Sequence, residues 1–154
     1  MEIGTRFLRR QTNTAFDMQD ISAGREYEDS LTFKSPALAQ MTIEPASFEA
    51  ENGNNPVAGK DRIIRGDWFT PIESDPQAFM LYLHGGGYAH YSKFHANLIA
   101  LVALSSDCKT FALDYRLIPE HPFPAQLEDA LAAYQWLLEN GVPPERLVVA
   151  GDSA

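Results

Sequence analysis

The sequence has little of what would place a protein in a membrane, in an oxidising compartment or on nucleic acid. It contains one cysteine, Cys108, so no disulfide can form within the chain. No apolar run approaches the roughly 20 residues of a membrane-spanning helix, and the basic N-terminus lacks the apolar stretch of a signal peptide. The formal net charge of −9 argues against nucleic acid or an anionic membrane as a partner. We therefore expect a cytoplasmic protein without a membrane span.

Hydrophobic residues are plentiful, and they indicate a folded domain. They make up 45% of the 154 residues, which is enough for one domain with a core. Residues 1–40 are polar with short apolar groups and predict short helices joined by loops. Residues 41–154 carry the pattern of an α/β core. The run 49–61 is dense in Asn, Gly and Pro, and it predicts a loop between two strands, TIEPASF and RIIRGDWFTP.

A strand–helix–strand–helix–strand pattern begins after residue 76. The apolar runs 78–83, 110–115 and 147–150 have the length and composition of strands buried on both faces. The first connecting helix has a predicted inner face of Phe94, Leu98, Leu101, Val102 and Ser105. The second begins at Pro124, ends before Gly141 and has a predicted inner face of Leu127, Ala130, Leu131, Tyr134, Leu137 and Leu138. This alternation predicts a mostly parallel sheet with helical crossovers.

Two stretches that can carry chemistry follow strands of this sheet, at the edge where open α/β sheets place their sites. HGGGY, 84–88, comes after the strand 78–83, and successive glycines can leave backbone N–H groups free to stabilise an oxyanion. AGDSA, 150–154, comes after the last strand, and a serine at a sharp, strained strand-to-helix turn exposes its Oγ as a nucleophile. Alone, either stretch also fits an ordinary turn or loop. Their order along the chain makes the pair a stronger signal than either motif.

Together with DYRLIPEHPFPAQLEDALAAYQWL, 114–137, these stretches resemble the hormone-sensitive-lipase branch of the α/β-hydrolases. The resemblance implies a mostly parallel sheet and a carboxylic ester hydrolase acting on a small-molecule ester, often of a short acyl chain, with no cofactor and no metal. It implies that Ser153 is the nucleophile. It also implies that Gly86 and Gly87, with the N–H of Ala154, form the oxyanion hole.

The same resemblance suggests roles for residues around the glycines. His84 and Gly85 are expected to shape the oxyanion loop. Tyr88 and Tyr91 are candidates for lining the substrate pocket, although packing beneath a cap is an equal alternative. The N-terminal segment 1–40 is expected to help cap the site, and 41–154 to form a partial α/β-hydrolase core.

The rest of the expected catalytic triad is missing from this sequence. In the family the acid and the histidine follow the serine, but here only Ala154 follows it. None of the four histidines matches the family's catalytic position: His84, His90, His95 and His121. Asp152 and a carboxylate at Ala154 would also bring negative charge to the oxyanion, and unit charges about 4 Å apart repel by about 4 kcal/mol at an effective dielectric of about 20. We therefore expect the N-terminal part of a longer esterase, inactive by itself.

The strand 147–150 carries a further expectation. As the last strand of this chain it should leave an apolar edge, and such an edge can pair with another chain. The sequence therefore predicts self-association through this strand.

Other functions compete with this interpretation. A non-catalytic binding protein or truncated gene product of the same fold would keep the pocket without the triad. A dinucleotide site needs G-x-G-x-x-G, and here its third glycine would fall at His90. The histidines near the glycines lack the spacing of zinc ligands. Outside the site, Cys108 is expected to pack between a helix and the next strand, and Asp114 and Arg116 to form a structural ion pair.

Overall fold

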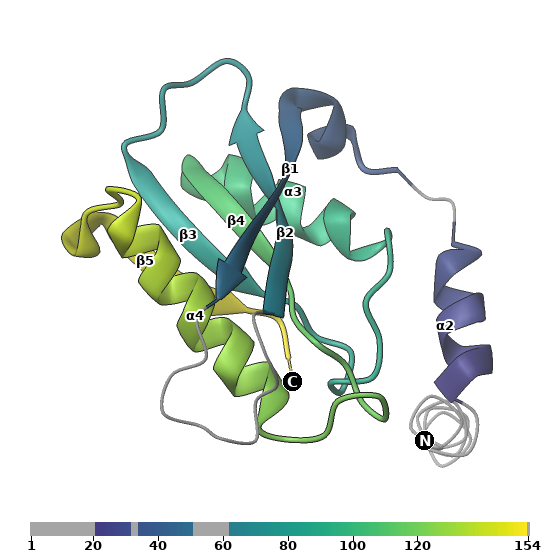
Figure 1. The fold of residues 1–154 in the computed structure, drawn as a ribbon. Coiled ribbons are helices and arrows are strands. Elements are labelled where there is room, and N and C mark those ends of the chain that lie inside the picture. The colour runs from purple at the N-terminus through teal and green to yellow at the C-terminus, as the bar shows by residue number, and fades with distance from the viewer. Residues whose placement is uncertain (1–20, 32–33, 51–61, 154) are drawn as a thin grey trace, which may run out of the picture.

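The computed structural model describes residues 21–31, 34–50 and 62–153, and Figure 1 shows how their elements are arranged. The predictions for residues 1–20 and for Ala154 lie outside these ranges. Two short helices, α2 (Ile21–Asp29) and η1 (Pro36–Gln40), agree with the short helices predicted near the N-terminus. The core elements follow in chain order: β1 Met41–Ala50, β2 Arg62–Pro71, β3 Ala78–Leu83, α3 His95–Ser106, β4 Cys108–Asp114, α4 Ala125–Glu139, η2 Pro144–Arg146 and β5 Leu147–Gly151.

The five strands form one mixed sheet in the order β1-β2-β4-β3-β5. β2 pairs antiparallel with both β1 and β4. β3 pairs parallel with both β4 and β5. All five predicted strands are present, although β4 starts and ends slightly earlier than predicted, at Cys108 and Asp114. β5 is the outermost strand on its side, so its outer edge has no partner strand among the described residues.

Side chains of each strand alternate between the two faces of the sheet, and each face packs on one long helix. Met80 and Tyr82 of β3 belong to the cluster that packs on α3. Leu81 belongs, with Phe111, to the cluster that packs on α4. Figure 1 shows α4 in front of the sheet and α3 behind it. Cys108 lies in the α3 cluster, as the sequence predicted.

The inner face of α3 differs from the predicted one. Three of the predicted inner residues are exposed by 40% or more: Phe94, Leu98 and Leu101. The buried residues are instead Asn97, Ile99, Ala100 and Ala103. Asn97 accepts a hydrogen bond from the N–H of Ser35 at 2.6 Å, which ties this face to the N-terminal segment. Two alanines let the helix pack closely on the sheet, so the leucine face turns outward.

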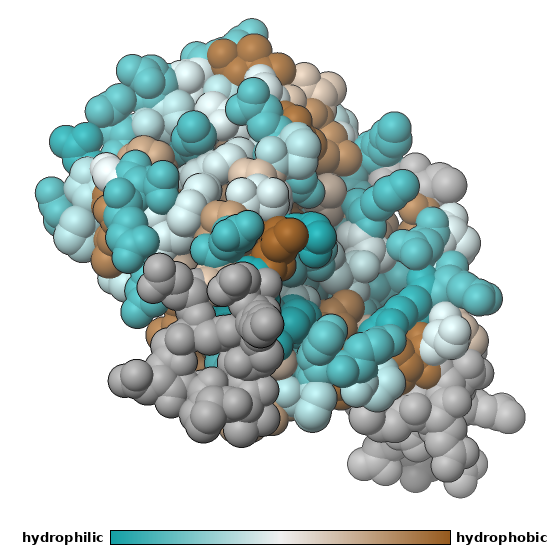
Figure 2. Space-filling model, viewed as in Figure 1, coloured by the Kyte–Doolittle hydropathy of each residue, from teal (hydrophilic) through white to brown (hydrophobic). Residues whose placement is uncertain are grey.

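The inner face of α4 is rotated in the same way. Leu127 and Leu131 are 49% and 54% exposed, whereas the buried residues are Ala125, Gln126, Asp129, Ala133 and Leu137. Asp129 accounts for the rotation, because its carboxylate accepts the Arg116 N–H at 2.9 Å and lies 3.0 Å from Arg62 Nε. A buried carboxylate must keep its partners, and keeping them turns Leu127 and Leu131 outward, whereas Leu137 stays buried. Figure 2 shows apolar residues reaching the surface among polar ones on this side of the molecule.

The end of α4 follows the predicted glycine. Asn140 is the C-cap, and Gly141 has a φ of 87°. The N–H groups of Gly141 and Val142 return to the carbonyls of Leu138 and Leu137. This pattern closes a helix around a left-handed glycine, and it directs the chain toward β5.

Candidate active site

The two predicted site segments lie side by side in the structure. They follow β3 and β5, which are parallel neighbours in register up to Leu83 and Gly151. A Cβ atom built on Gly85 would lie 2.8 Å from Ser153 Cβ and 2.6 Å from Asp152 Oδ2. A side chain at position 85 would therefore displace the serine segment. The sheet topology brings together residues that the sequence assigned to one site.

Hydrogen bonds hold the first peptide group of the glycine loop from both sides. The N–H of Gly85 donates to Asp152 Oδ1 at 2.8 Å, and the Tyr115 hydroxyl donates to the His84 carbonyl at 2.5 Å. In a trans peptide the N–H and C=O point in opposite directions, so these bonds pull on one plane from opposite sides. The Tyr82 hydroxyl also donates to Asp152 Oδ1, at 3.0 Å.

The next two peptide groups are oriented through their carbonyls. The Gly85 carbonyl accepts from His84 Nδ1 at 2.7 Å, and the Gly86 carbonyl accepts two N–H groups of the following turn at 3.1 Å each. By the same trans geometry, the N–H groups of Gly86 and Gly87 point away from these contacts. Neither donates a hydrogen bond within the described residues. Two adjacent free N–H groups are what an oxyanion hole requires.

The turn that follows explains why this loop is rich in glycine. Gly86 and Gly87 have φ values of 117° and 61°, and Tyr88 follows with 60°. A side chain on Gly86 would also collide with the carbonyl oxygen of His90. Such left-handed backbone is strained for residues with a Cβ atom and easy for glycine.

His84 is buried between two tyrosine rings. It is 1% exposed, and its ring centre lies 3.9 Å from that of Tyr91 and 4.0 Å from that of Tyr115. Burial lowers the pKa of His84 to about 4, so the imidazole is neutral at pH 7. Because the Gly85 carbonyl can only accept, Nδ1 carries the proton. The other ring nitrogen, Nε2, is buried and has no hydrogen-bond partner among the described residues, so His84 does not reach Ser153 as a general base.

Ser153 is exposed, and no described histidine forms a hydrogen bond with it. His95 contacts the loop before α3. His90 faces Glu28 of α2, with 3.8 Å between Nδ1 and Oε1. His121 is exposed in the loop before α4. Within the described residues, the serine therefore has no base.

The turn predicted at the serine is described only as far as Ser153. Among the described non-glycine residues, a positive φ occurs at Tyr88 and Asp107 and not at Ser153. Ala154, the third predicted oxyanion donor, lies outside them.

Asp152 has contacts that the sequence did not reveal. From the sequence alone, Asp152 is expected only to bring negative charge to the oxyanion. Its carboxylate instead accepts from Gly85 and from Tyr82, which is 2% exposed. β3 and β5 pair with Tyr82 opposite Ala150, which brings its hydroxyl to Asp152. The sequence signal for this contact is Tyr82 itself, which lies inside a predicted buried strand. A buried hydroxyl needs a hydrogen-bond partner.

The two tyrosines after the glycines have different environments. Tyr91 stacks on His84 and packs against the α3 cluster. This environment favours a packing role for Tyr91 over a place in the substrate pocket. Tyr88 is 46% exposed, and its ring centre lies 6.3 Å from that of Tyr115. Of the two, Tyr88 has the more accessible ring.

The helix α2 reaches the loop through Arg25. Arg25 Nε donates to the Ala89 carbonyl and Nη2 to the Ile118 carbonyl, both at 2.8 Å. The same guanidinium pairs with Glu120 at 2.8 Å and lowers the pKa of that carboxyl to about 2. These contacts join segments far apart in the sequence, and no local pattern announces them.

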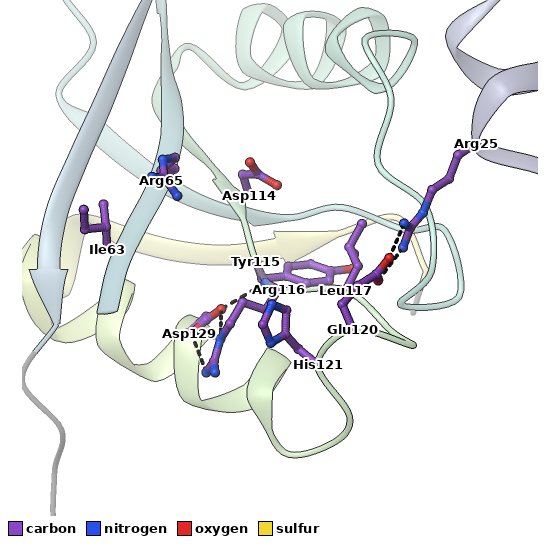
Figure 3. Close-up of a pocket in the computed structure, with 10 residues that line it drawn as sticks. All are labelled: Arg25, Ile63, Arg65, Asp114, Tyr115, Arg116, Leu117, Glu120, His121 and Asp129. Atoms are coloured by element: carbon purple, nitrogen blue, oxygen red, sulfur yellow. Dashed lines mark hydrogen bonds and ion pairs between the residues drawn. The ribbon is translucent and has the colours of Figure 1, made fainter. Parts of the chain in front are cut away.

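An open pocket of about 300 Å³ lies next to Tyr115. Figure 3 shows that Arg25 reaches Glu120 from α2 at one side of it and that Arg116 meets Asp129 at another. Its charged walls are thus largely paired among themselves. None of the predicted site residues lines this pocket.

The predicted ion pair between Asp114 and Arg116 is wrong. Arg116 Nη2 lies 2.9 Å from Asp129 and 3.0 Å from Glu128 instead. The physical reason is the buried Asp129 at the start of α4, a carboxylate that requires cationic or N–H partners. Arg116 supplies both, through its side chain and its backbone N–H.

Residues 21–31, 34–50 and 62–153 contain no group of three or more His, Cys, Asp or Glu residues that could hold a metal ion. No helix in them is long and apolar enough to cross a membrane.

Known esterases and lipases resemble this chain in sequence and in fold. Residues 80–154 match a family model described as the alpha/beta hydrolase fold. An acetyl-hydrolase of Streptomyces hygroscopicus is 47% identical over 89 residues, 57% of this chain and 29% of that protein. Esterase LipU of Mycobacterium tuberculosis is 36% identical over 117 residues, 75% of this chain and 39% of that protein. The chain thus spans well under half the length of these relatives.

Solved structures agree with the sequence matches. An esterase/lipase from an uncultured bacterium superimposes with a TM-score of 0.70 at 34% identity, over 87% of this chain and 41% of that one. An esterase from the bacterial hormone-sensitive lipase family gives a TM-score of 0.70 at 30% identity, over 93% of this chain and 44% of that one. The predicted fold and the predicted resemblance are confirmed.

Proposed function

We propose, since residues 80–154 belong to the α/β-hydrolase fold family, that the protein carrying this chain is a carboxylic ester hydrolase. The names of its relatives, which include esterases, a lipase and an acetyl-hydrolase, support this. One observation carries the proposal. The free N–H groups of Gly86 and Gly87 belong to a loop that contacts the segment of Ser153.

The chemistry follows from these positions. Ser153 Oγ attacks the carbonyl carbon of the ester, and the carbonyl oxygen becomes an oxyanion. The N–H groups of Gly86, Gly87 and Ala154 stabilise that oxyanion, each by about 3–4 kcal/mol. When the intermediate collapses, the alcohol leaves and the acyl group stays on Ser153 until water removes it. His84 and Gly85 hold the loop and do not react.

The proton of Ser153 Oγ needs a base, and no described residue supplies one. A serine hydroxyl without an adjacent base is a weak nucleophile at neutral pH. Residues 1–154 by themselves are therefore inactive in this proposal, and activity belongs to a protein that supplies a histidine and an acid at Ser153. A non-catalytic binding protein of the same fold is the alternative that this missing contact favours.

The proposal extends to the substrate, the cap over the site and the cellular compartment. Short acyl esters are the proposed substrates, and the exposed ring of Tyr88 is proposed to contact them beside the glycine loop. The N-terminal segment, which Arg25 fastens to Ala89 beside the loop, is the proposed cap. No cofactor is needed for the reaction as written. The single free cysteine, Cys108, supports a cytoplasmic setting.

The edge of β5 is a proposed surface for self-association. Val148 and Val149 are 51% and 52% exposed there, and an unpaired apolar strand edge is a template for pairing. Val149→Lys should shift a self-associated 154-residue chain toward monomer in sedimentation velocity, with Thr42→Lys as the control. An unchanged distribution would count against pairing through β5.

The function is tested with the protein as its source organism produces it. Hydrolysis of p-nitrophenyl acetate and p-nitrophenyl butyrate is compared for the unaltered protein, Ser153→Ala and a control, Ser105→Ala, whose serine is exposed on α3. Loss of the nucleophile should lower kcat by about 10⁴-fold or more, and the control should keep the full rate. A rate that survives in Ser153→Ala, or no hydrolysis at all by the unaltered protein, contradicts the proposal and favours the binding protein.

A further inference from the structure

We propose that Asp152 and Tyr115 are positioning residues that hold the His84–Gly85 peptide from opposite sides and so aim the N–H groups of Gly86 and Gly87 at the oxyanion. The proposal rests on the hydrolase function proposed above. It assigns to Asp152 a task separate from that of its neighbour Ser153, and to Tyr115 a task outside the pocket that its ring lines.

The first support is that both contacts act on one peptide plane. Asp152 Oδ1 accepts the Gly85 N–H at 2.8 Å, and the Tyr115 hydroxyl donates to the His84 carbonyl at 2.5 Å. A peptide bonded at one end can still tilt about that bond. When both ends are bonded in opposite directions, tilting the plane stretches at least one of the two hydrogen bonds.

The second support is burial. Tyr115 is 5% exposed and Tyr82, the second donor to Asp152, is 2% exposed. Burial raises the pKa of both hydroxyls above the ordinary tyrosine value. Both groups therefore stay protonated and donate throughout the working pH range. Buried donors and acceptors that are all paired rigidify a site.

The third support is the path from this plane to the oxyanion donors. The ring of Tyr115 stacks on His84 at 4.0 Å, and His84 Nδ1 holds the Gly85 carbonyl at 2.7 Å. That carbonyl shares its peptide group with the Gly86 N–H. Tyr115 thus supports the loop twice, by its hydroxyl and by its ring. Phenylalanine at this position would remove the first support and keep the second.

The test uses Tyr115→Phe and Asp152→Asn in the protein as its source produces it. The matched control is Tyr134→Phe, because Tyr134 packs on the α4 side of the core and its hydroxyl has no described hydrogen bond. Kinetic constants are measured with p-nitrophenyl butyrate, together with inhibition by a phenylboronic acid, whose serine adduct is tetrahedral.

We expect kcat to fall about 5- to 10-fold in Tyr115→Phe and about 10-fold or more in Asp152→Asn, with KM within about twofold. Boronic acid inhibition should weaken in parallel, because the adduct uses the same N–H groups. Tyr134→Phe should keep the original kcat. A higher KM with unchanged kcat, or an unchanged kcat in both variants, overturns the proposal.

Two further measurements keep the test decisive. If Asp152→Asn does not fold, Tyr82→Phe removes one of the two donors to Asp152, and kcat should fall about threefold. If the unaltered protein lacks Ser153-dependent hydrolysis, the proposed function fails. Amide hydrogen exchange still tests whether Asp152 holds the His84–Gly85 peptide. The Gly85 amide should exchange at least about tenfold faster in Asp152→Ala than in the unaltered protein. Equal Gly85 exchange rates in Asp152→Ala and the unaltered protein would contradict the positioning role of Asp152, whether or not the protein is active.

Discussion

The glycine loop and the outer faces of the two long helices distribute their side chains in opposite ways. In the loop region, polar groups are buried: His84 is 1% exposed and Tyr115 is 5% exposed. On the helices, large apolar groups face outward, and Leu101 and Leu131 are 51% and 54% exposed. The usual rule of apolar side chains inside and polar side chains outside fails in both regions, for different reasons.

The difference shows that burial has separate uses in the two regions. In the loop region, His84 Nδ1 and the Tyr115 hydroxyl are buried and hydrogen-bonded, so their burial fixes orientation at little net cost, whereas His84 Nε2 is buried without a partner. On the helices, close packing by alanines and the partners of Asp129 decide which face turns inward. Leu101 and Leu131 are left outside by these stronger constraints.

The largest expected effect comes from adding a methyl group to the loop. Gly86→Ala should lower the free energy of unfolding by about 4 kcal/mol, because its φ of 117° is strained for alanine and its Cβ would meet the His90 carbonyl. Gly141→Ala is the matched control, with a φ of 87° and nothing within 4 Å of its Cβ. It should cost about 1 kcal/mol. Equal losses in urea unfolding would show that the loop is not tightly packed at Gly86.

The next effect separates the two faces of α4. Leu137→Ala should lower the free energy of unfolding by about 3 kcal/mol, because Leu137 is 1% exposed. Leu131→Ala removes the same atoms from a residue that is 54% exposed, and it should change stability by less than about 1 kcal/mol. Urea unfolding of both variants measures the difference. A larger loss at Leu131 would mean that Leu131, and not Leu137, packs in the core.

A pH dependence tests the buried histidine. Since burial lowers the pKa of His84 to about 4, the unfolded chain takes up a proton near its ordinary pKa of about 6.5 before the folded protein does. The stability contributed by His84 is therefore present above about pH 6.5 and is lost as the pH falls toward 4. Between pH 7 and pH 4.5 the loss should be about 2 kcal/mol.

His84→Asn should remove this component of the pH dependence, whereas the control His121→Asn, at an exposed histidine, should keep it. Thermal or urea unfolding at several pH values between 7 and 4.5 measures both slopes. If the His84→Asn slope matches that of the unaltered protein, His84 is not the buried neutral group described here.

The smallest effect concerns the link between α2 and the loop. Glu120→Gln weakens an exposed ion pair with Arg25, so the global stability should hardly change. Proteolysis within α2 should become about threefold faster, since local opening is easier when one fastening contact is weakened. Glu145→Gln, at an exposed residue of η2, is the control. Identical cleavage rates would show that the pair does not fasten α2.

Much of the fold was predictable from local patterns. Short apolar runs predicted β3, β4 and β5, and the Asn/Gly/Pro-rich run 51–61 marked β1 and β2 on either side of it. The expected burial of β5 on both faces is wrong, because Val148 and Val149 are 51% and 52% exposed. The glycine after α4 marked its end, because Gly141 is left-handed. The faces of α3 and α4 were mispredicted, since periodicity identifies an apolar face but not the competing demand of Asp129 and Asn97 for partners.

The sequence by itself determined the order of the elements and the two motifs, because a three-glycine loop and a serine after a buried strand are local features of the chain. Tertiary structure decided what surrounds them. Strand pairing brings Tyr82 and Asp152 together, and the turn after β4 brings Tyr115 to His84. These contacts join residues remote in sequence, and hydrogen-bond geometry depends on the folded arrangement of strands rather than on any pattern along the chain.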